Sequence, residues 1–416
     1  MADDLQESTA EGLLAPAVGQ ERYGFLDALR GFSLLGIILA NMISLSLYLY
    51  LPTAAKATFA TASTDKVVDF VELVLIESKF YTIFSVLFGV GFSILITRAR
   101  AKSIVFDRFF LRRMLFLFLI GLAHAVLFWH NDILEAYALC GVLLLPLARA
   151  RNRTILTCAA VALLAPLVVE LTKAIPAGTF TGPRDLLFAR FGVTAAERVP
   201  MWAEGGFADI LLVNAGSWFG QVDYVITSGM MFKIYGCFLL GLYIGRSELY
   251  KRLDLHRLAI KRIAILGLVV GLPLNVIYAR TFEAESWLHK LIATFGIIPL
   301  SAAYVCLFAW LWLHSDGARL ARIFEPVGRL ALTNYVVQSV ISMFIFRGVG
   351  LGLGGKIGPT LYIPIGLAIY VLQLVASRAW LRRFQFGPVE WLWRMLTYGA
   401  RVPLRKQPRV LVQPAA

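Results

Sequence analysis

Residues 25–50 read FLDALRGFSLLGIILANMISLSLYLY, an apolar run interrupted by Asp27 and Arg30 near its start and by Asn41 further along. A helix that crosses the hydrocarbon of a bilayer needs about 20 mostly apolar residues. The whole chain of 416 residues is 59% hydrophobic and only 16% charged, which is too apolar for a soluble domain. Its apolar runs are unbroken, whereas the strands of a membrane barrel alternate. The sequence therefore predicts an all-α integral membrane protein.

The same length criterion selects about ten spanning helices along the chain. Their expected extents are Phe25 to Tyr50, Phe80 to Ile96, Phe109 to Trp129, Ile133 to Ala148, Thr154 to Leu171, Val225 to Gly245, Ile263 to Tyr278, Leu291 to Leu313, Leu330 to Phe346 and Leu361 to Val375. Outside these spans, Val67 to Ser78 is expected to form an interfacial or re-entrant helix, and Phe384 to Thr397 a cytoplasmic interfacial helix.

The basic residues predict the orientation of these helices. Cytoplasmic loops of membrane proteins are enriched in Lys and Arg. When loops are numbered alternately, one side receives 28 of the 40 Lys and Arg residues and the other receives 12, which predicts that both termini lie in the cytoplasm. The net charge of +14 is distributed in short clusters between apolar runs, so it indicates membrane topology and no nucleic-acid partner.

Composition divides the chain into four parts. Residues 1–21 are acidic and are expected to form a mobile cytoplasmic tail, and residues 22–245 form a first membrane region. Within that region, residues 173–224 mix Gly, Pro, charged and aromatic residues, which predicts a folded cap on the outer side. Residues 246–400 form a second membrane region, and residues 401–416 a basic cytoplasmic tail. The four cysteines lack CxxC spacing, so no metal site is expected.

Charged and amide side chains in the first helix need an explanation, because such groups are costly in hydrocarbon. Asp27 and Arg30 are three residues apart and can pair on one helix face. Asn41 lies eleven residues after Arg30, about 16 Å deeper at 1.5 Å per residue. These side chains either bind substrate or serve as an interfacial anchor and an interhelical hydrogen bond.

A second polar group lies where the third predicted helix turns into the fourth. It contains His124, Asp132 and Tyr137. A histidine in a dry environment stays neutral and can act as a general base, and Asp132 could orient it. The alternative is that His124 bonds a neighbouring helix and Asp132 caps the next one.

Two further sets complete the candidate substrate-binding residues. Asn334 and Gln338 are four residues apart, so they lie on one helix face that must look into the bundle. Helix-to-helix hydrogen bonding explains them equally well. Lys79 lies at the outer mouth of the second predicted helix, where it binds substrate or only extends to the surface.

Five blocks of sequence, taken in order, resemble the YeiB-like family of bacterial inner-membrane proteins. They are YGFLDALRGFSLLGIILANM (23–42), SKFYTIFSVLFGVGFSI (78–94), RRMLFLFLIGLAHAVLFWHNDILEAYALCG (112–141), GRLALTNYVVQS (328–339) and FGPVEWLWRMLT (386–397). The resemblance covers nearly the whole chain. It implies a distant relation to transmembrane acyltransferases, including the heparan-alpha-glucosaminide N-acetyltransferases and the sugar O-acyltransferases.

Single residues carry this resemblance. Asp27, Arg30 and Gly31 match the motif that opens the first helix of those acyltransferases, and Asn41 matches an asparagine or histidine eleven positions after the arginine. His124, Asp132 and Tyr137 match the YeiB-like block. Two departures stand out: Asn131 occupies a position where glycine commonly precedes the aspartate, and no histidine occurs between Asn41 and Lys79, where the heparan-type enzymes have one.

The resemblance implies an enzyme that moves an acyl group from cytoplasmic acyl-CoA, such as acetyl-CoA, to a hydroxyl or amine reached from the outer side of the bacterial inner membrane. His124, Asp132 and Asn41 are then the expected catalytic residues. Arg30, with Arg108, Arg112 and Arg113, is expected to bind the acyl donor. No tightly bound cofactor is expected; the acceptor is left open, with an envelope glycan or a lipid as the candidates. The competing hypotheses are a transporter or flippase and a non-catalytic envelope protein.

Overall fold

The computed structural model describes residues 23–101, 106–282 and 287–406. The predicted tail at residues 1–21 and the end of the basic tail lie outside this part. Its α-helices are α2 (Gly24–Leu45), α3 (Thr53–Lys56), α4 (Ala62–Leu75), α5 (Lys79–Ala101), α6 (Phe106–Leu127), α7 (Leu134–Val142), α8 (Asn152–Thr172), α9 (Gly182–Phe191), α10 (Arg198–Glu204), α11 (Phe207–Thr227), α12 (Met230–Arg246), α13 (Arg257–Arg280), α14 (Trp287–Trp312), α15 (Ser315–Ala321), α16 (Glu325–Arg329), α17 (Ala331–Phe346), α18 (Pro359–Arg383) and α19 (Pro388–Tyr398).

The predicted all-α fold is confirmed. In the described residues, seven helices are long and apolar enough to cross a membrane, or up to nine when each of two bent helix pairs counts as one span. Large apolar side chains such as Val161, Leu266 and Val269 are 64–66% exposed on the outer helices, as expected for a surface that faces lipid. The fourth predicted span, Ile133 to Ala148, is not one long helix. It consists of α7, which has nine residues, and the 3-10 helix Pro146–Arg149. The count of ten crossings and the orientation stay predictions.

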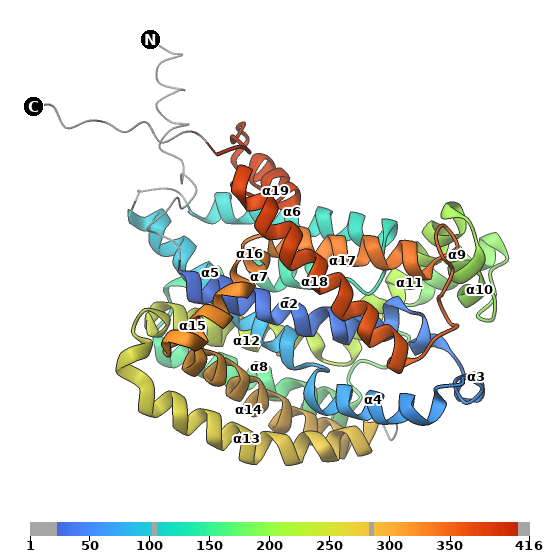
Figure 1. Ribbon diagram of the computed structural model, residues 1–416, viewed down its shortest axis with the longest axis horizontal. Coiled ribbons are helices and arrows are strands. Elements are labelled where there is room, and N and C mark those ends of the chain that lie inside the picture. Colours follow the sequence, from blue (N-terminus) through green and yellow to red (C-terminus); the bar gives the residue numbers. More distant parts are fainter. Residues whose placement is uncertain (1–22, 102–105, 283–286, 407–416) are drawn as a thin grey trace, which may run out of the picture.

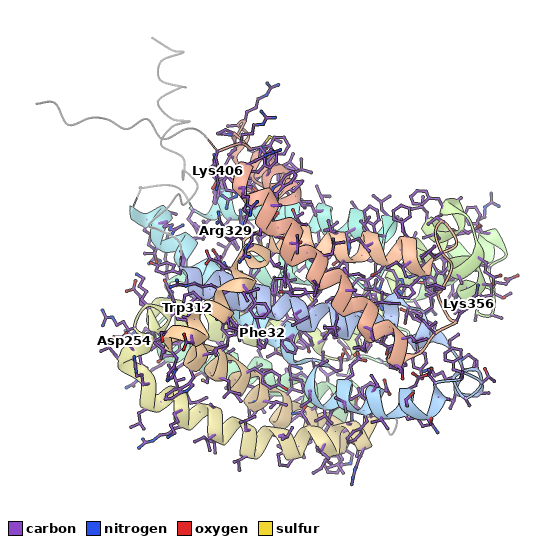
Figure 2. All side chains as sticks on the ribbon, viewed as in Figure 1. Phe32, Asp254, Trp312, Arg329, Lys356 and Lys406 are labelled. Carbon is purple, nitrogen blue, oxygen red and sulfur yellow. The ribbon has the colours of Figure 1, made fainter. Side chains whose placement is uncertain are left out.

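The long helices lie roughly side by side, and most of the short helices, α7 excepted, lie toward the two ends of the bundle (Figure 1). We call the end that carries α15, α16 and α19 the basic end, and the opposite end, with α3, α9 and α10, the cap end. Asp254 and Lys406 mark the basic end and Lys356 the cap end in Figure 2. The predicted re-entrant segment is α4, which together with α5 forms a single candidate span from Ala62 to Arg100.

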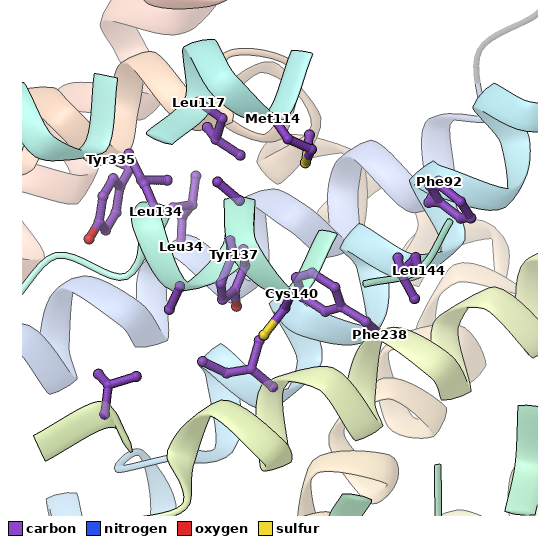
Figure 3. Close-up of a cluster of buried hydrophobic side chains, with 14 of the residues drawn as sticks. Leu34, Phe92, Met114, Leu117, Leu134, Tyr137, Cys140, Leu144, Phe238 and Tyr335 are labelled. Carbon is purple, nitrogen blue, oxygen red and sulfur yellow. The ribbon is translucent and has the colours of Figure 1, made fainter. Parts of the chain in front are cut away.

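Helix α2 lies at the centre of the bundle. Its residues Leu34, Ile38 and Met42 are fully buried, and the surrounding apolar cluster draws side chains from α5, α6, α7, α12 and α17. Figure 3 shows this cluster, in which Leu34 of α2 and Phe238 of α12 lie around α7. Burying apolar side chains on every face of α2 holds its polar residues inside the protein and away from lipid.

Two glycines set the contact between α2 and α16. A Cβ atom on Gly31 would lie 2.0 Å from the backbone oxygen of Phe324, and one on Gly328 would lie 1.8 Å from the backbone oxygen of Asp27. Real Cβ atoms do not approach that closely, so only glycine permits the two backbones to touch. This contact places Asp27 and Arg30 directly beside α16.

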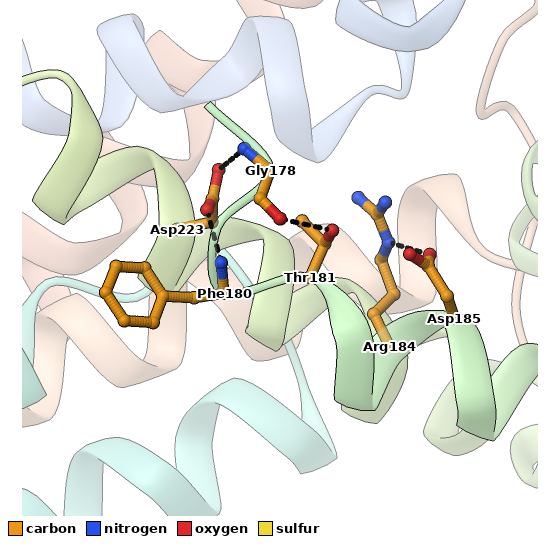
Figure 4. A network of polar contacts seen from close by, with 6 residues as sticks. All are labelled: Gly178, Phe180, Thr181, Arg184, Asp185 and Asp223. Atoms are coloured by element: carbon orange, nitrogen blue, oxygen red, sulfur yellow. Dashed lines mark hydrogen bonds and ion pairs between the residues drawn. The ribbon is translucent and has the colours of Figure 1, made fainter. Parts of the chain in front are cut away.

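The segment predicted to form a cap, residues 173–224, is largely helical. It comprises α9, α10 and most of α11. Asp223 of α11 accepts hydrogen bonds of 2.9 Å from the backbone nitrogens of Gly178 and Phe180, which ties the segment after α8 to α11 (Figure 4). In the same network Arg184 Nε lies 2.9 Å from Oδ1 of Asp185 on the exposed surface of α9. The segment that begins the cap is therefore held by one buried carboxylate.

Candidate functional site

A cavity of about 1280 Å³ lies inside the bundle. Its lining extends from Trp393 and Arg394 of α19 at the basic end to Pro176 and Ala177 of the cap at the other end. A space of this size accommodates a ligand larger than a typical drug molecule. The polar side chains that line it fall into three groups, which lie at the basic end, in the middle and at the cap end.

Arginines dominate the basic end of the cavity. Arg30, Arg98, Arg113, Arg329 and Arg394 line it together with two carboxylates, Asp27 and Glu390. Five cations against two anions leave a surplus of positive charge, which favours a polyanionic ligand.

The arginine side chains in this group are held in defined positions. Arg30 Nη1 lies 2.7 Å from Oδ1 of Asp27, as the sequence predicted. The guanidinium of Arg113 stacks over the Trp393 ring, with its carbon 3.6 Å from the ring centroid. The predicted partners of Arg113 are placed differently: Arg108 and Arg112 are exposed on α6 and do not line the cavity. The helix face that Arg113 occupies turns inward, whereas theirs turns outward.

Glu390 joins α19 to α17. Its carboxylate accepts hydrogen bonds from the backbone nitrogens of Leu332 (2.7 Å) and Thr333 (3.0 Å), and from the Thr333 hydroxyl (2.5 Å). Burial raises the pKa of the Glu390 carboxyl above its usual value. The carboxylate therefore satisfies the free N–H groups at the start of α17 and fixes the wall of the cavity.

Asn41 and Tyr137, two of the predicted site residues, lie in the middle of the cavity wall. The Tyr137 hydroxyl is 2.6 Å from the Ser85 hydroxyl and donates to the backbone oxygen of Tyr81 (3.2 Å). Among the described residues, the Asn41 carboxamide has no hydrogen-bond partner and is only half-buried. Asn41 is therefore free to bond a ligand, whereas Tyr137 is already engaged.

At the cap end the Ser44 hydroxyl oxygen accepts two hydrogen bonds. Ser44 Oγ accepts hydrogen bonds from Trp129 Nε1 (3.0 Å) and Asn131 Nδ2 (2.7 Å). Asn131 Nδ2 also lies 2.9 Å from the Tyr50 hydroxyl. These contacts are the physical role of Asn131, which departs from the expected motif at this position. Ser44, Trp129 and Asn131 all line the cavity.

The predicted base and its orienting carboxylate are close together behind the cavity wall. His124 Nδ1 lies 3.3 Å from Asp132 Oδ1, and the two residues are 2% and 3% exposed. Neither ring nitrogen of His124 makes a hydrogen bond within the described part of the chain. Tyr335 donates a 2.6 Å hydrogen bond to Asp132 Oδ1, and it is Tyr335 that lines the cavity. The structure brings the pair together but leaves it one residue away from the open space.

Three predicted substrate-binding residues lie elsewhere. Asn334 donates to Val327 O (3.2 Å) and Ser377 Oγ (3.0 Å), and Gln338 donates to Gln373 Oε1 (2.9 Å). The bonds to Ser377 and Gln373 join α17 to α18, and the bond to Val327 joins α17 to α16, so they match the alternative of helix-to-helix bonding. Lys79 is fully buried and donates to Leu73 O (2.5 Å). None of the three lines the cavity.

The cavity also contains residues that the sequence reading left out of the site. Glu77, Lys233 and His289 line its cap end. Glu77 accepts a 3.0 Å hydrogen bond from the Ser78 hydroxyl, Lys233 lies 4.8 Å from the centroid of the Tyr81 ring, and His289 stacks on Tyr278 with ring centroids 4.6 Å apart. Lys233 could have been noticed as a cation inside an apolar helix. His289 has no such local signal, because only the packing of α13 against α14 brings it to the cavity.

Comparison with known proteins places this architecture in a family. The family model described as "Protein of unknown function (DUF418)" matches residues 244–400. The chain is 31% identical to "Uncharacterized protein YxaH" of Bacillus subtilis (strain 168), over 95% of this chain and 99% of that protein. It is 28% identical to "Uncharacterized protein YeiB" of Escherichia coli (strain K12), over 92% of this chain and 98% of that protein. No solved structure matches the chain. The coverage and identity of these relatives show that the chain belongs to the YeiB-like family.

Proposed function

We propose that the protein is an acyltransferase of the bacterial inner membrane, which takes an acyl group from acyl-CoA at the basic end and delivers it to a hydroxyl or amine acceptor at the cap end. One observation carries the proposal: a single cavity is lined by five arginines at its basic end, by the Asn41 carboxamide in its middle, and by the hydrogen-bonding groups of Ser44 and Asn131, together with Glu77 and Lys233, at its cap end. The basic end would then face the cytoplasm, where acyl-CoA is made. The bacterial origin of the relatives supports this location.

The chemistry of CoA fits this polarity. Its phosphate groups are recognised by arginine through paired, charge-assisted hydrogen bonds. The distance along α2 from Arg30 to Asn41, about 16 Å, suits the extended pantetheine arm between the phosphates and the thioester. Arg30 and Asn41 both line the cavity, so a donor bound by the arginines would bring its thioester near Asn41.

In the proposed reaction the acceptor oxygen or nitrogen attacks the thioester carbonyl carbon. The C–S bond breaks, the CoA thiolate leaves, and the proton lost by the acceptor passes to a base and finally to the thiolate. The Asn41 carboxamide is the donor available to stabilise the oxyanion. His124, oriented by Asp132, is the base that the sequence predicted. It reaches an acceptor only when the Tyr335 ring moves aside, whereas Glu77 already faces the cavity.

The test uses purified protein in detergent, with acetyl-CoA binding measured by calorimetry, thioester loss by thiol release, and acyl capture by addition of a periplasmic extract. Arg113→Gln should weaken acetyl-CoA binding by about tenfold or more, since charge-assisted hydrogen bonds are lost. Arg108→Gln, on the exposed face of the same helix, is the matched control and should bind normally. Folded protein that neither binds acetyl-CoA nor consumes it would overturn the proposal.

His124→Ala and Glu77→Gln identify the base. The variant that removes the base should lose turnover while it retains acetyl-CoA binding, because neither side chain belongs to the arginine group. Retained turnover in His124→Ala would assign the proton transfer to another residue, with Glu77 as the first candidate. Loss of turnover in His124→Ala alone would show that Tyr335 gives way during the reaction.

A transporter is the second candidate function, and one observation favours it. Two helix pairs are bent, α11 with α12 by 64° and Ser315–Arg329 with α17 by 78°, and residues at both bends line the cavity. Broken helices beside a central binding site are typical of secondary transporters. Proteoliposomes separate the two functions: a transporter moves its substrate across the bilayer without consuming acyl-CoA.

A further inference from the structure

A buried arginine at the cap end plays no part in the cavity described above. Arg347 follows the last residue of α17 and is 1% exposed. Its guanidinium carbon lies 5.0 Å from the centroid of the Trp202 ring. The Nη1 and Nη2 atoms have no hydrogen-bond partner among the described residues. Buried guanidinium nitrogens whose N–H groups are unused are costly, because they have lost water without gaining a hydrogen bond.

No carboxylate of the described chain forms an ion pair with Arg347. The neighbouring backbone of Glu204 packs against Gly348, but the Glu204 side chain is 69% exposed and lies 3.8 Å from Lys356. Burial lowers the pKa of Arg347 to about 10, so the side chain remains charged at neutral pH. The positive charge of Arg347 therefore faces the Trp202 ring but has no ion-pair partner among the described residues.

The residues around Arg347 are rigidly placed. His130 is 3% exposed and stacks on Trp202 with ring centroids 4.8 Å apart and an interplanar angle of 7°. Trp202 Nε1 donates to Asn214 Oδ1 at 2.9 Å, which fixes the indole. His130 Nε2 lies 3.0 Å from the Tyr50 hydroxyl, while Nδ1 has no partner among the described residues. When Tyr50 donates to Nε2, the ring proton sits on Nδ1 and gives a further free donor.

This group adjoins the main cavity through Tyr50. The Tyr50 hydroxyl is 3.0 Å from Ser44 Oγ and 2.9 Å from Asn131 Nδ2, and both of these residues line the cap end of the cavity. A molecule held at Arg347 by one group would thus have its neighbouring groups beside Ser44 and Asn131. That is where the acceptor of the proposed reaction must bind.

We propose that Arg347, His130, Tyr50 and Trp202 form a binding site for a carboxylate or phosphate group, and that the acceptor is an anionic molecule. The planar guanidinium matches both groups in a two-pronged geometry. The identification of the ligand as the acceptor rests on the proposed acyltransferase function; the anion site itself does not. The anion belongs either to a small soluble molecule or to a lipid headgroup.

Trp202 gives the site its own optical signal. The protein is placed in nanodiscs of phosphatidylcholine and titrated with inorganic phosphate and with acetate, and the fluorescence of the Trp202→Phe variant is subtracted. We expect a saturable change in the Trp202 signal. Nanodiscs that contain phosphatidylglycerol form the second arm. If they produce the changed signal without added anion, the ligand is a lipid headgroup; a response only to phosphate or acetate indicates a soluble molecule.

The variants separate a binding site from a structural contact. Arg347→Gln should require about tenfold more anion or fail to respond, and Lys356→Gln, which removes an exposed charge at the same end, should respond normally. Arg347→Gln should also unfold at the same or a higher temperature than the wild type without anion, because an unpaired buried charge has been removed. A lower unfolding temperature together with an unchanged titration would overturn the proposal.

These measurements use no acyl-CoA, so their outcome does not depend on whether the protein is an acyltransferase. A saturable, Arg347-dependent response in a protein that never consumes acetyl-CoA would leave the anion site standing and refute the acyltransferase. Turnover of acetyl-CoA in a protein without any Trp202 response, in either kind of nanodisc, would refute the anion site alone.

Discussion

The hydroxyl of Tyr335 donates a 2.6 Å hydrogen bond to Oδ1 of Asp132, and through this bond the cavity wall is joined to the buried His124. Tyr335 lies on α17, which follows the bend at Leu330, whereas Asp132 lies between α6 and α7. The ring centroids of Tyr335 and His124 are 5.3 Å apart. Any chemistry at His124 therefore depends on the position of α17.

Tyr335→Phe removes the hydrogen bond that the Tyr335 hydroxyl donates to Asp132 Oδ1, and Oδ2 of Asp132 already lacks a partner in the described part of the chain. We expect the free energy of unfolding in detergent to fall by about 1–3 kcal/mol, which is the cost of leaving a buried acceptor without a hydrogen bond. Tyr235→Phe, which loses an exposed hydrogen bond to Leu143 O, is the control and should change little. Equal effects of the two variants would show that the Asp132 bond is unimportant.

Gly31→Ala should destabilise the protein by about 1–3 kcal/mol, because the new methyl group must displace the backbone of α16. The nearest atom, the backbone oxygen of Phe324, lies 2.0 Å from the Cβ position. Gly91→Ala is the matched control: its Cβ would meet only an Arg30 nitrogen at 3.8 Å. Thermal unfolding of both variants measures the difference. A stable Gly31→Ala protein would mean that α2 and α16 are not in contact in the membrane.

Glu390 should make stability depend on pH. Because burial raises its pKa in the folded state above the unfolded value of 4.5, the folded protein binds the proton more tightly. The resulting stabilisation is fully present below pH 4.5 and is lost as pH rises through the raised pKa. Glu390→Gln lacks this titration. The unfolding temperature of the wild type should therefore fall relative to that of Glu390→Gln as the pH rises above 4.5. A difference that stays constant with pH would contradict the prediction.

The variants Asn334→Ala and Asn41→Ala should have opposite effects, because the Asn334 amide joins helices and the Asn41 amide faces the cavity. Asn334→Ala should lower the free energy of unfolding by about 0.6–1.7 kcal/mol, the range for hydrogen bonds between membrane helices, and leave acetyl-CoA binding unchanged. Asn41→Ala should have the opposite profile, with little loss of stability and impaired turnover, because its carboxamide has no partner to lose in the described structure. Calorimetric binding, thiol release and thermal unfolding of both variants provide the comparison.

Asp223→Asn should loosen the start of the cap. The carboxylate accepts two backbone hydrogen bonds, from Gly178 and Phe180, and an amide has only one oxygen to accept them. Limited proteolysis should then cleave residues 173–181 faster than in the wild type, by about fivefold for a loss of about 1 kcal/mol. Asp185→Asn, whose carboxylate pairs with Arg184 on the surface, is the control. Identical digestion patterns for both variants would rule out the role of Asp223.

Contacts between residues that are close together in the chain could be predicted from the sequence. Asp27 and Arg30 pair because they are three residues apart on one helix, and His124 meets Asp132 because α6 turns directly into the next segment. Both contacts are set by short separations along the chain. Asn41 and Asn334 looked alike in sequence, as single amides in apolar helices, yet Asn41 faces the cavity and Asn334 bonds α18.

The sequence by itself determined that this is an all-α membrane protein, because hydropathy and helix length are properties of each segment alone. Only the tertiary structure decided which polar side chains share a cavity. In these helices apolar residues occupy nearly every face, and lipid and protein interior are equally apolar, so the rotation of a helix about its axis leaves little trace in its sequence. Packing of distant helices placed Arg113 inside and Arg108 outside, brought His289 to the cavity, and buried Arg347 against Trp202.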